Sequence, residues 1–249
     1  MQRIANPCTS VRFRLAPPAL MRAVSIMDPQ VVAAMARWPD VPAVYGWLSL
    51  TEAGQWRLHP AGNALQQPDS PGEPITSPQI LAFLDRNYAS DDDGCWYFQN
   101  GPQRVYVRLD ATPYILRTTT DTANGRLRLR THTGLDVRDI TALYLDAQGR
   151  LYMATDRGPG LVAGRDLPAV FDALEGADGT DAAELIAEFI ETGRGVQLRS
   201  QSMSGFPARA VPLSTCTPES LQETLGFRRC PSAPPSSEAP AGEEGPASR

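Results

Sequence analysis

Three short strand–turn–strand patterns constrain the fold of this chain more than any other feature. The central one covers residues 94–109, where aromatic and β-branched residues flank the turn sequence Asn100-Gly101-Pro102. Similar patterns surround residues 51–54 and 146–149, two turns that begin with Thr or Asp and end with Gly. Strands joined by such tight turns run antiparallel, because a parallel pair needs a long crossover. The patterns therefore predict a largely antiparallel sheet of sequential hairpins.

Helical patterns accompany these hairpins along the chain. Apolar residues recur at helical spacing in five segments, and several of these begin with a capping residue followed by proline. The predicted class is α+β, with helices packed near both ends of the folded body and without parallel βαβ units. The predicted helices follow Pro29 and Pro78 and cover 167–174, 180–192 and 218–225, and a further strand pair covers 112–119 and 126–133.

Composition divides the chain into three parts. Residues 1–26 contain four Arg and no acidic residue, and they lack the apolar stretch of a signal peptide. Residues 231–249 are rich in Pro, Ala, Ser and Glu and contain no aromatic residue, so they have little to bury. We expect a disordered N-terminal extension over 1–26, a single α+β domain over 27–230 with a sub-boundary near residue 165, and a disordered tail over 231–249.

The composition also excludes several kinds of chemistry. All 23 basic residues are Arg, so the chain has no lysine amine for a Schiff base, a pyridoxal phosphate linkage or a phosphate-binding loop. The net charge of -5 argues against nucleic-acid binding. No run of 18 apolar residues is present, so no membrane partner is expected.

Metal and cofactor motifs are missing as well. The four Cys show no Cys-x-x-Cys spacing, and the two His, His59 and His132, are far apart, so no metal site is predicted. We expect both His at the surface and residues 91–93, three consecutive Asp, in a solvated turn. Four Cys in a chain of this length fit a reducing cytoplasm, which is the expected location.

Two other sequence patterns resemble ligand-binding motifs but have simpler structural explanations. Gly158, Gly160 and Gly164 have the spacing G-x-G-x-x-x-G, which differs from a dinucleotide loop, so we expect a turn and a short strand and no cofactor. Arg126, Arg128 and Arg130 alternate with Leu. That row can bind an anion, but alternation alone is explained by a solvent-facing strand.

The central hairpin carries the candidate binding site. Alternation places Arg104, Tyr106 and Arg108 on one face of a strand and apolar side chains on the other. Tyr and Arg commonly anchor interfaces, whereas Trp47, Trp56 and Trp96 are expected in the core. The same residues have a second interpretation, in which they lock the turn. The candidate binding residues are Gln99, Asn100, Gln103, Arg104 and Tyr106.

These observations favour a binding or interaction module that uses an aromatic and arginine sheet face, with a protein partner. One alternative is a hydrolase-type enzyme that uses two carboxylates as acid and base, and another is a structural subunit of a larger assembly. No nucleophile motif is recognised, so an enzyme is disfavoured and no catalytic residue is assigned. The available carboxylates are Asp85, Asp91, Asp136 and Asp156.

The sequence resembles an uncharacterised proteobacterial domain family of unknown function. The similarity is carried by Phe98–Val107, with the sequence FQNGPQRVYV, and by Val44–Leu48 and Gly160–Val162. It extends over residues 27–170. The resemblance implies a shared fold but no activity, so it transfers no catalytic residue to this chain.

Overall fold

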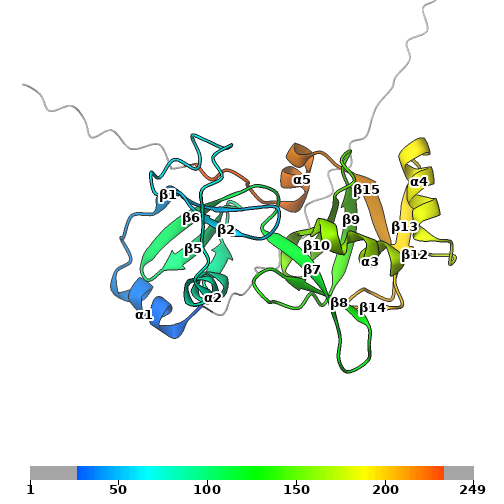
Figure 1. Cartoon of the computed structure of the whole chain (residues 1–249), viewed down its shortest axis with the longest axis horizontal. Helices are drawn as coiled ribbons and strands as arrows, with labels where there is room; N and C mark the ends of the chain where they lie inside the picture. Colours follow the sequence, from blue (N-terminus) through cyan, green and yellow to red (C-terminus); the bar gives the residue numbers. More distant parts are fainter. Residues whose placement is uncertain (1–26, 233–249) are drawn as a thin grey trace, which may run out of the picture.

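The computed structural model describes residues 27–232, which form two sheets lying side by side (Figure 1). The predicted extension over 1–26 and most of the predicted tail over 231–249 lie outside the described residues. The first sheet has six strands, namely β1 (Val44–Leu50), β2 (Trp56–Leu58), β3 (Glu73–Pro74), β4 (Tyr88–Ser90), β5 (Trp96–Asn100) and β6 (Gln103–Leu109), in the order β3-β2-β1-β6-β5-β4.

The second sheet has nine strands, and most of its neighbours are antiparallel. The two sheets separate at residues 110–113, whereas residue 165 lies within a short 3-10 helix, Gly164–Asp166, in the second half of the chain. The strands are β7 (Tyr114–Thr120), β8 (Leu127–Thr131), β9 (Ile140–Leu145), β10 (Leu151–Thr155), β11 (Gly158–Val162), β12 (Glu175–Gly176), β13 (Val196–Arg199), β14 (Met203–Ser204) and β15 (Val211–Thr215), in the order β12-β13-β15-β9-β10-β11-β7-β8-β14.

Within residues 27–232, five α-helices complete the α+β fold that the sequence predicts. Helix α2 lies between strands of the first sheet in sequence, so the helices are spread along the chain and not gathered clearly at its two ends. The longest described helix has 11 residues, which is too short to cross a membrane. The helices are α1 (Pro29–Arg37), α2 (Pro78–Arg86), α3 (Leu167–Asp172), α4 (Ala182–Thr192) and α5 (Pro218–Leu225).

All three predicted hairpins form, as β1–β2, β5–β6 and β9–β10. Four other pairings are parallel and connect strands that are distant in sequence, for example β1 with β6 and β9 with β15. The sheets are therefore mixed, though mostly antiparallel. Local turn signals cannot predict such long-range pairings.

One hydrophobic core joins the inner faces of the two sheets. Val105, Val107 and Leu109 of β6 contribute to it, as alternation predicts, and Trp56 and Trp96 are buried there. The expectation for Trp47 is wrong, because this side chain is 43% exposed. A register shift between Val44 and Leu48 interrupts the alternation of β1 next to Trp47.

Candidate functional site

The five predicted binding residues lie at the β5–β6 hairpin, on two different faces. Gln99 pairs with Arg104 and Tyr97 with Tyr106, so these four side chains share the outer face of the first sheet. Asn100 pairs with Gln103 one step along the strands, where alternation points the other way. The hairpin loop is therefore Gly101-Pro102, with a φ of 58° at Gly101 and a negative φ at Asn100. Glycine first in a two-residue loop is typical of a type II′ turn.

Most of the predicted binding residues, which we call the hairpin patch, contact other residues of the chain. Gln99 donates to the carbonyl of Gly101 at 2.9 Å, and Gln103 donates to that of Pro42 at 3.2 Å. The Arg104 guanidinium lies 4.7 Å above the ring of Tyr97. Tyr106 stacks on Tyr45 at 4.6 Å and is almost completely buried. These contacts support the turn-locking interpretation, and a binding role for the five residues stays a prediction.

The Tyr106 hydroxyl connects the patch to the three consecutive Asp. It donates to Oδ2 of Asp91 at 2.9 Å, while Oδ1 of Asp91 accepts from the backbone N–H groups of Asp93 and Cys95. Burial, together with this hydrogen bond and the negative charge of Asp91, raises the pKa of Tyr106. Asp91 thus organises the turn before β5.

Further along the same outer face, two arginines and a serine form a row across three strands. Ser49 of β1 pairs with Arg57 of β2 on one side and with Arg108 of β6 on the other. Arg108 is 5% exposed, and it binds Asp110 at 3.1 Å and the carbonyl of Ala64 at 2.8 Å. A buried guanidinium is stable only with such partners. Arg108 therefore fastens the loop over 59–72 to the sheet.

A groove of about 600 Å³ opens at the end of this row, and we call it the Arg57 groove. The β1–β2 turn forms part of it, and the loop over 59–72 and the segment after α5 form the rest. Its polar lining contains three guanidinium and three carboxylate groups. The charged residues of the groove are Arg57, Arg108, Arg229, Glu52, Asp69 and Asp110, and Cys230, an exposed free cysteine, also lines it.

On this face, beside Arg57 and Arg108, Ser49 and His59 form a hydrogen-bonded pair. The Ser49 Oγ lies 2.9 Å from Nε2 of His59, and both side chains are fully buried, so the expectation of a surface His59 is wrong. Burial, and next the positive charge of Arg108, lowers the pKa of His59. Its Nδ1 has no partner within residues 27–232. The pair presents no nucleophile to solvent and has no orienting carboxylate of the kind found in catalytic triads.

The ring of His132 is also enclosed, which corrects the second surface expectation. It lies 5.7 Å from Trp56 and 6.0 Å from both Tyr88 and Tyr114, between the two sheets. Its Nδ1 accepts a hydrogen bond from the backbone of Ile115 at 3.3 Å. Burial, with a contribution from Arg117, lowers the pKa of His132 to about 3. The sequence gives no sign of this, because the aromatic neighbours come from three different strands.

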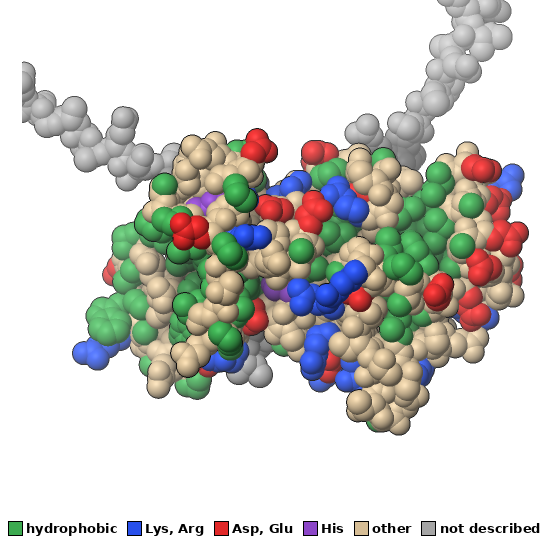
Figure 2. Space-filling model, in the orientation of Figure 1, with side chains coloured by type: hydrophobic (Ala, Val, Ile, Leu, Met, Phe, Trp, Pro, Cys, Tyr) green, Lys and Arg blue, Asp and Glu red, His purple; other side chains and the backbone are tan. Residues whose placement is uncertain are grey.

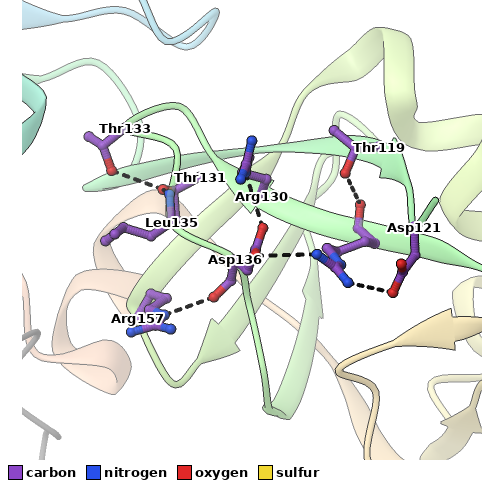
Figure 3. Close-up of polar contacts among 9 residues, drawn as sticks. Thr119, Asp121, Arg130, Thr131, Thr133, Leu135, Asp136 and Arg157 are labelled. Atoms are coloured by element: carbon purple, nitrogen blue, oxygen red, sulfur yellow. Dashed lines mark hydrogen bonds and ion pairs between the residues drawn. The ribbon is translucent and has the colours of Figure 1, made fainter. Parts of the chain in front are cut away.

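The arginine row of β8 is largely neutralised by neighbouring carboxylates (Figure 3). Arg128 binds Asp121 and also Asp136, at 3.3 Å, and Arg130 binds Asp136 at 3.0 Å. A backbone hydrogen bond from Ala123, and then Arg128, lowers the pKa of Asp121. Figure 2 shows the blue side chains of this region in the middle of the molecule, interspersed with red ones. Arg128 and Arg130 therefore belong to a network of surface ion pairs, whereas Arg126 donates to the carbonyl of Gln201.

The four carboxylates considered for acid–base chemistry are engaged separately. Asp85 accepts from the indole of Trp56 at 3.0 Å, and Asp156 accepts from backbone N–H groups of 138 and 139. Asp91 and Asp136 have the partners described above. Within residues 27–232, no group of three or more His, Cys, Asp or Glu side chains is placed to hold a metal ion. Gly158 and Gly160 belong to strand β11, as the turn-and-strand interpretation predicts.

The residues that sequence reasoning missed are those of the Arg57 groove. Arg57 and Arg108 are 51 positions apart along the chain, and a parallel pairing brings their strands together through β1. Only the alternation of Arg108 with Val107 and Leu109 gave a signal, and it could not indicate that Arg57 and Arg229 would join the same groove.

Comparisons with known proteins place the chain in a family without assigning it an activity. Two solved structures of DUF1285 family proteins are similar to it. The one from Silicibacter pomeroyi DSS-3 is 16% identical with a TM-score of 0.43, and the match covers 79% of this chain and 90% of that chain. The one from Shewanella baltica OS155 is 12% identical with a TM-score of 0.35, covering 50% and 90%. No curated protein matches the chain.

The family assignment comes from a separate match. A family model described as "Protein of unknown function (DUF2946)" matches residues 27–232, which is most of the 249 residues. The match begins at residue 27, where the folded body was predicted to begin. It confirms the resemblance to a domain family of unknown function. The chain is therefore a member of this DUF2946 family of proteins of unknown function.

Proposed function

We propose that this protein is a binding module that takes a small polar ligand in the Arg57 groove. The carrying observation is the groove itself, which has a volume typical of small-molecule sites and convergent polar groups from three separate segments. The groove lies on the arginine face of the first sheet, which is the face predicted to bind. The proposed site is the groove, however, and not the β5–β6 hairpin.

The surroundings of the groove support a preformed site. Arg108 and its partners fix the loop over 59–72, and Arg229 donates to the carbonyl of Leu109 at 3.2 Å, which fixes the segment after α5. Rigid walls reduce the ordering cost of binding. The thiols of Cys95, Cys216 and Cys230 are free, and we propose a reducing cytoplasm as the compartment.

A fluorescent reporter on Cys230 tests this proposal. Cys95 and Cys216 react slowly, because burial raises the pKa of each thiol to about 11, and Cys8→Ser removes the fourth thiol. The labelled full-length protein is titrated with succinate, inorganic phosphate, glucose and spermidine at constant ionic strength. We expect at least one probe to change the fluorescence saturably.

Two tryptophan variants provide the matched comparison. Ala53→Trp fills the groove from the exposed β1–β2 turn, whereas Ala123→Trp adds the same side chain at an exposed turn near β8. We expect Ala53→Trp to abolish the response and Ala123→Trp to retain it. The proposal fails if no probe produces a saturable signal, or if both variants respond alike.

A further inference from the structure

The guanidinium of Arg57 lacks a carboxylate partner within residues 27–232. Its Nη2 donates to the amide oxygen of Gln55 at 2.8 Å, and its Nε is enclosed without any hydrogen-bond partner. Buried N–H groups, including those of arginine, nearly always donate to a hydrogen-bond acceptor. A guanidinium without a carboxylate partner at the wall of a groove indicates an anionic group supplied from outside the chain.

Two of the three acidic residues of the groove already have an arginine partner. Arg108 is paired with Asp110, and Glu52 is paired with Arg150 at 2.9 Å. Arg229 donates to the backbone carbonyls of Leu109 and Asp110. Within the described residues, the guanidinium groups of Arg57 and Arg229 therefore have no carboxylate partner, and Asp69 is the remaining acidic residue of the groove.

Resting on the proposed function, we infer that the ligand of the groove carries an oxyanion, a carboxylate or a phosphate, and that this group binds Arg57. The planar guanidinium presents parallel N–H donors that match two oxygens of such a group. The oxyanion neutralises the charge of Arg57, which has no carboxylate partner within residues 27–232. Arg229 adds a second positive charge from the neighbouring segment.

The labelled protein distinguishes this inference from the broader proposal. We expect succinate or inorganic phosphate to bind saturably, and the stronger of the two identifies a carboxylate or a phosphate ligand. Arg57→Met should weaken that binding at least tenfold, whereas Arg165→Met, at an arginine whose side chain is 73% exposed, should leave it unchanged.

Other outcomes overturn the inference. Saturable binding of only glucose or spermidine leaves the groove as a binding site but refutes the oxyanion. Equal oxyanion affinity in Arg57→Met and the parent refutes the role of Arg57, provided that circular dichroism shows both proteins folded. If Arg57→Met does not fold, Arg57→Lys replaces it, because lysine keeps the positive charge but lacks the parallel N–H donors of the guanidinium. Equal oxyanion affinity in Arg57→Lys and the parent then contradicts a guanidinium-specific contact.

Discussion

Two rows of arginine lie on the sheets of this protein, and their surroundings give them different properties. On the first sheet, Arg57 and Arg108 lie on a face that is partly covered by a loop, and one of them has an unused donor at a groove. On the second sheet, Arg128 and Arg130 lie at the surface, where Asp121 and Asp136 neutralise them. The same alternating signal in the sequence thus produces a candidate ligand site in one sheet and a surface network in the other.

The largest expected effect comes from breaking the covered row. Arg108→Met leaves Asp110 and the carbonyls of residues 64 and 67 without their donor, so we expect a loss of about 3 kcal/mol in the free energy of unfolding. Urea denaturation measures it. The matched variant Arg130→Met removes a side chain that is 49% exposed and should cost less than about 1 kcal/mol. Equal losses in the two variants would show that the rows do not differ energetically.

The pH dependence of stability tests the surroundings of the β8 row, because His132 directly follows this strand and is enclosed between the sheets. The imidazole of the unfolded chain takes up a proton near pH 6.5, whereas the folded protein resists protonation until about pH 3. The folded state therefore binds fewer protons in this window and loses stability as the pH falls, with a slope approaching about 1.4 kcal/mol per pH unit.

The variant His132→Asn keeps an acceptor near the backbone N–H of Ile115 but cannot titrate. Urea denaturation between pH 6.5 and 4.5 should therefore show a shallower loss of stability for this variant than for the parent. Parallel curves would mean that the folded protein protonates His132 as readily as the unfolded chain does.

The smallest expected effect concerns Arg104, the arginine of the hairpin patch. Arg104→Ala removes the contact with the ring of Tyr97 and should cost about 1 kcal/mol in the free energy of unfolding. Arg165→Ala is the exposed control and should change little. An unchanged unfolding free energy in Arg104→Ala would argue against turn locking and favour contact with a protein partner.

The local parts of the fold were predictable from the sequence. Glycine-containing turns located the hairpins, and apolar periodicity located the helices, because both signals act between residues close in the chain. The face assignment of β6 was also correct, with Val105, Val107 and Leu109 in the core. The exposed Trp47 was not foreseen, because a register shift in one strand breaks the alternation on which the prediction depended.

The sequence by itself determined the hairpins, the α+β class and the chemistry that a chain without lysine cannot perform. Only the tertiary structure decided that there are two sheets, that parallel pairing brings Arg57 and Arg108 into one row, and that both histidines are enclosed. The physical reason is that turns and periodicity depend on neighbours in the chain, whereas strand order, burial of charge and the partners of an arginine depend on residues that are distant in sequence.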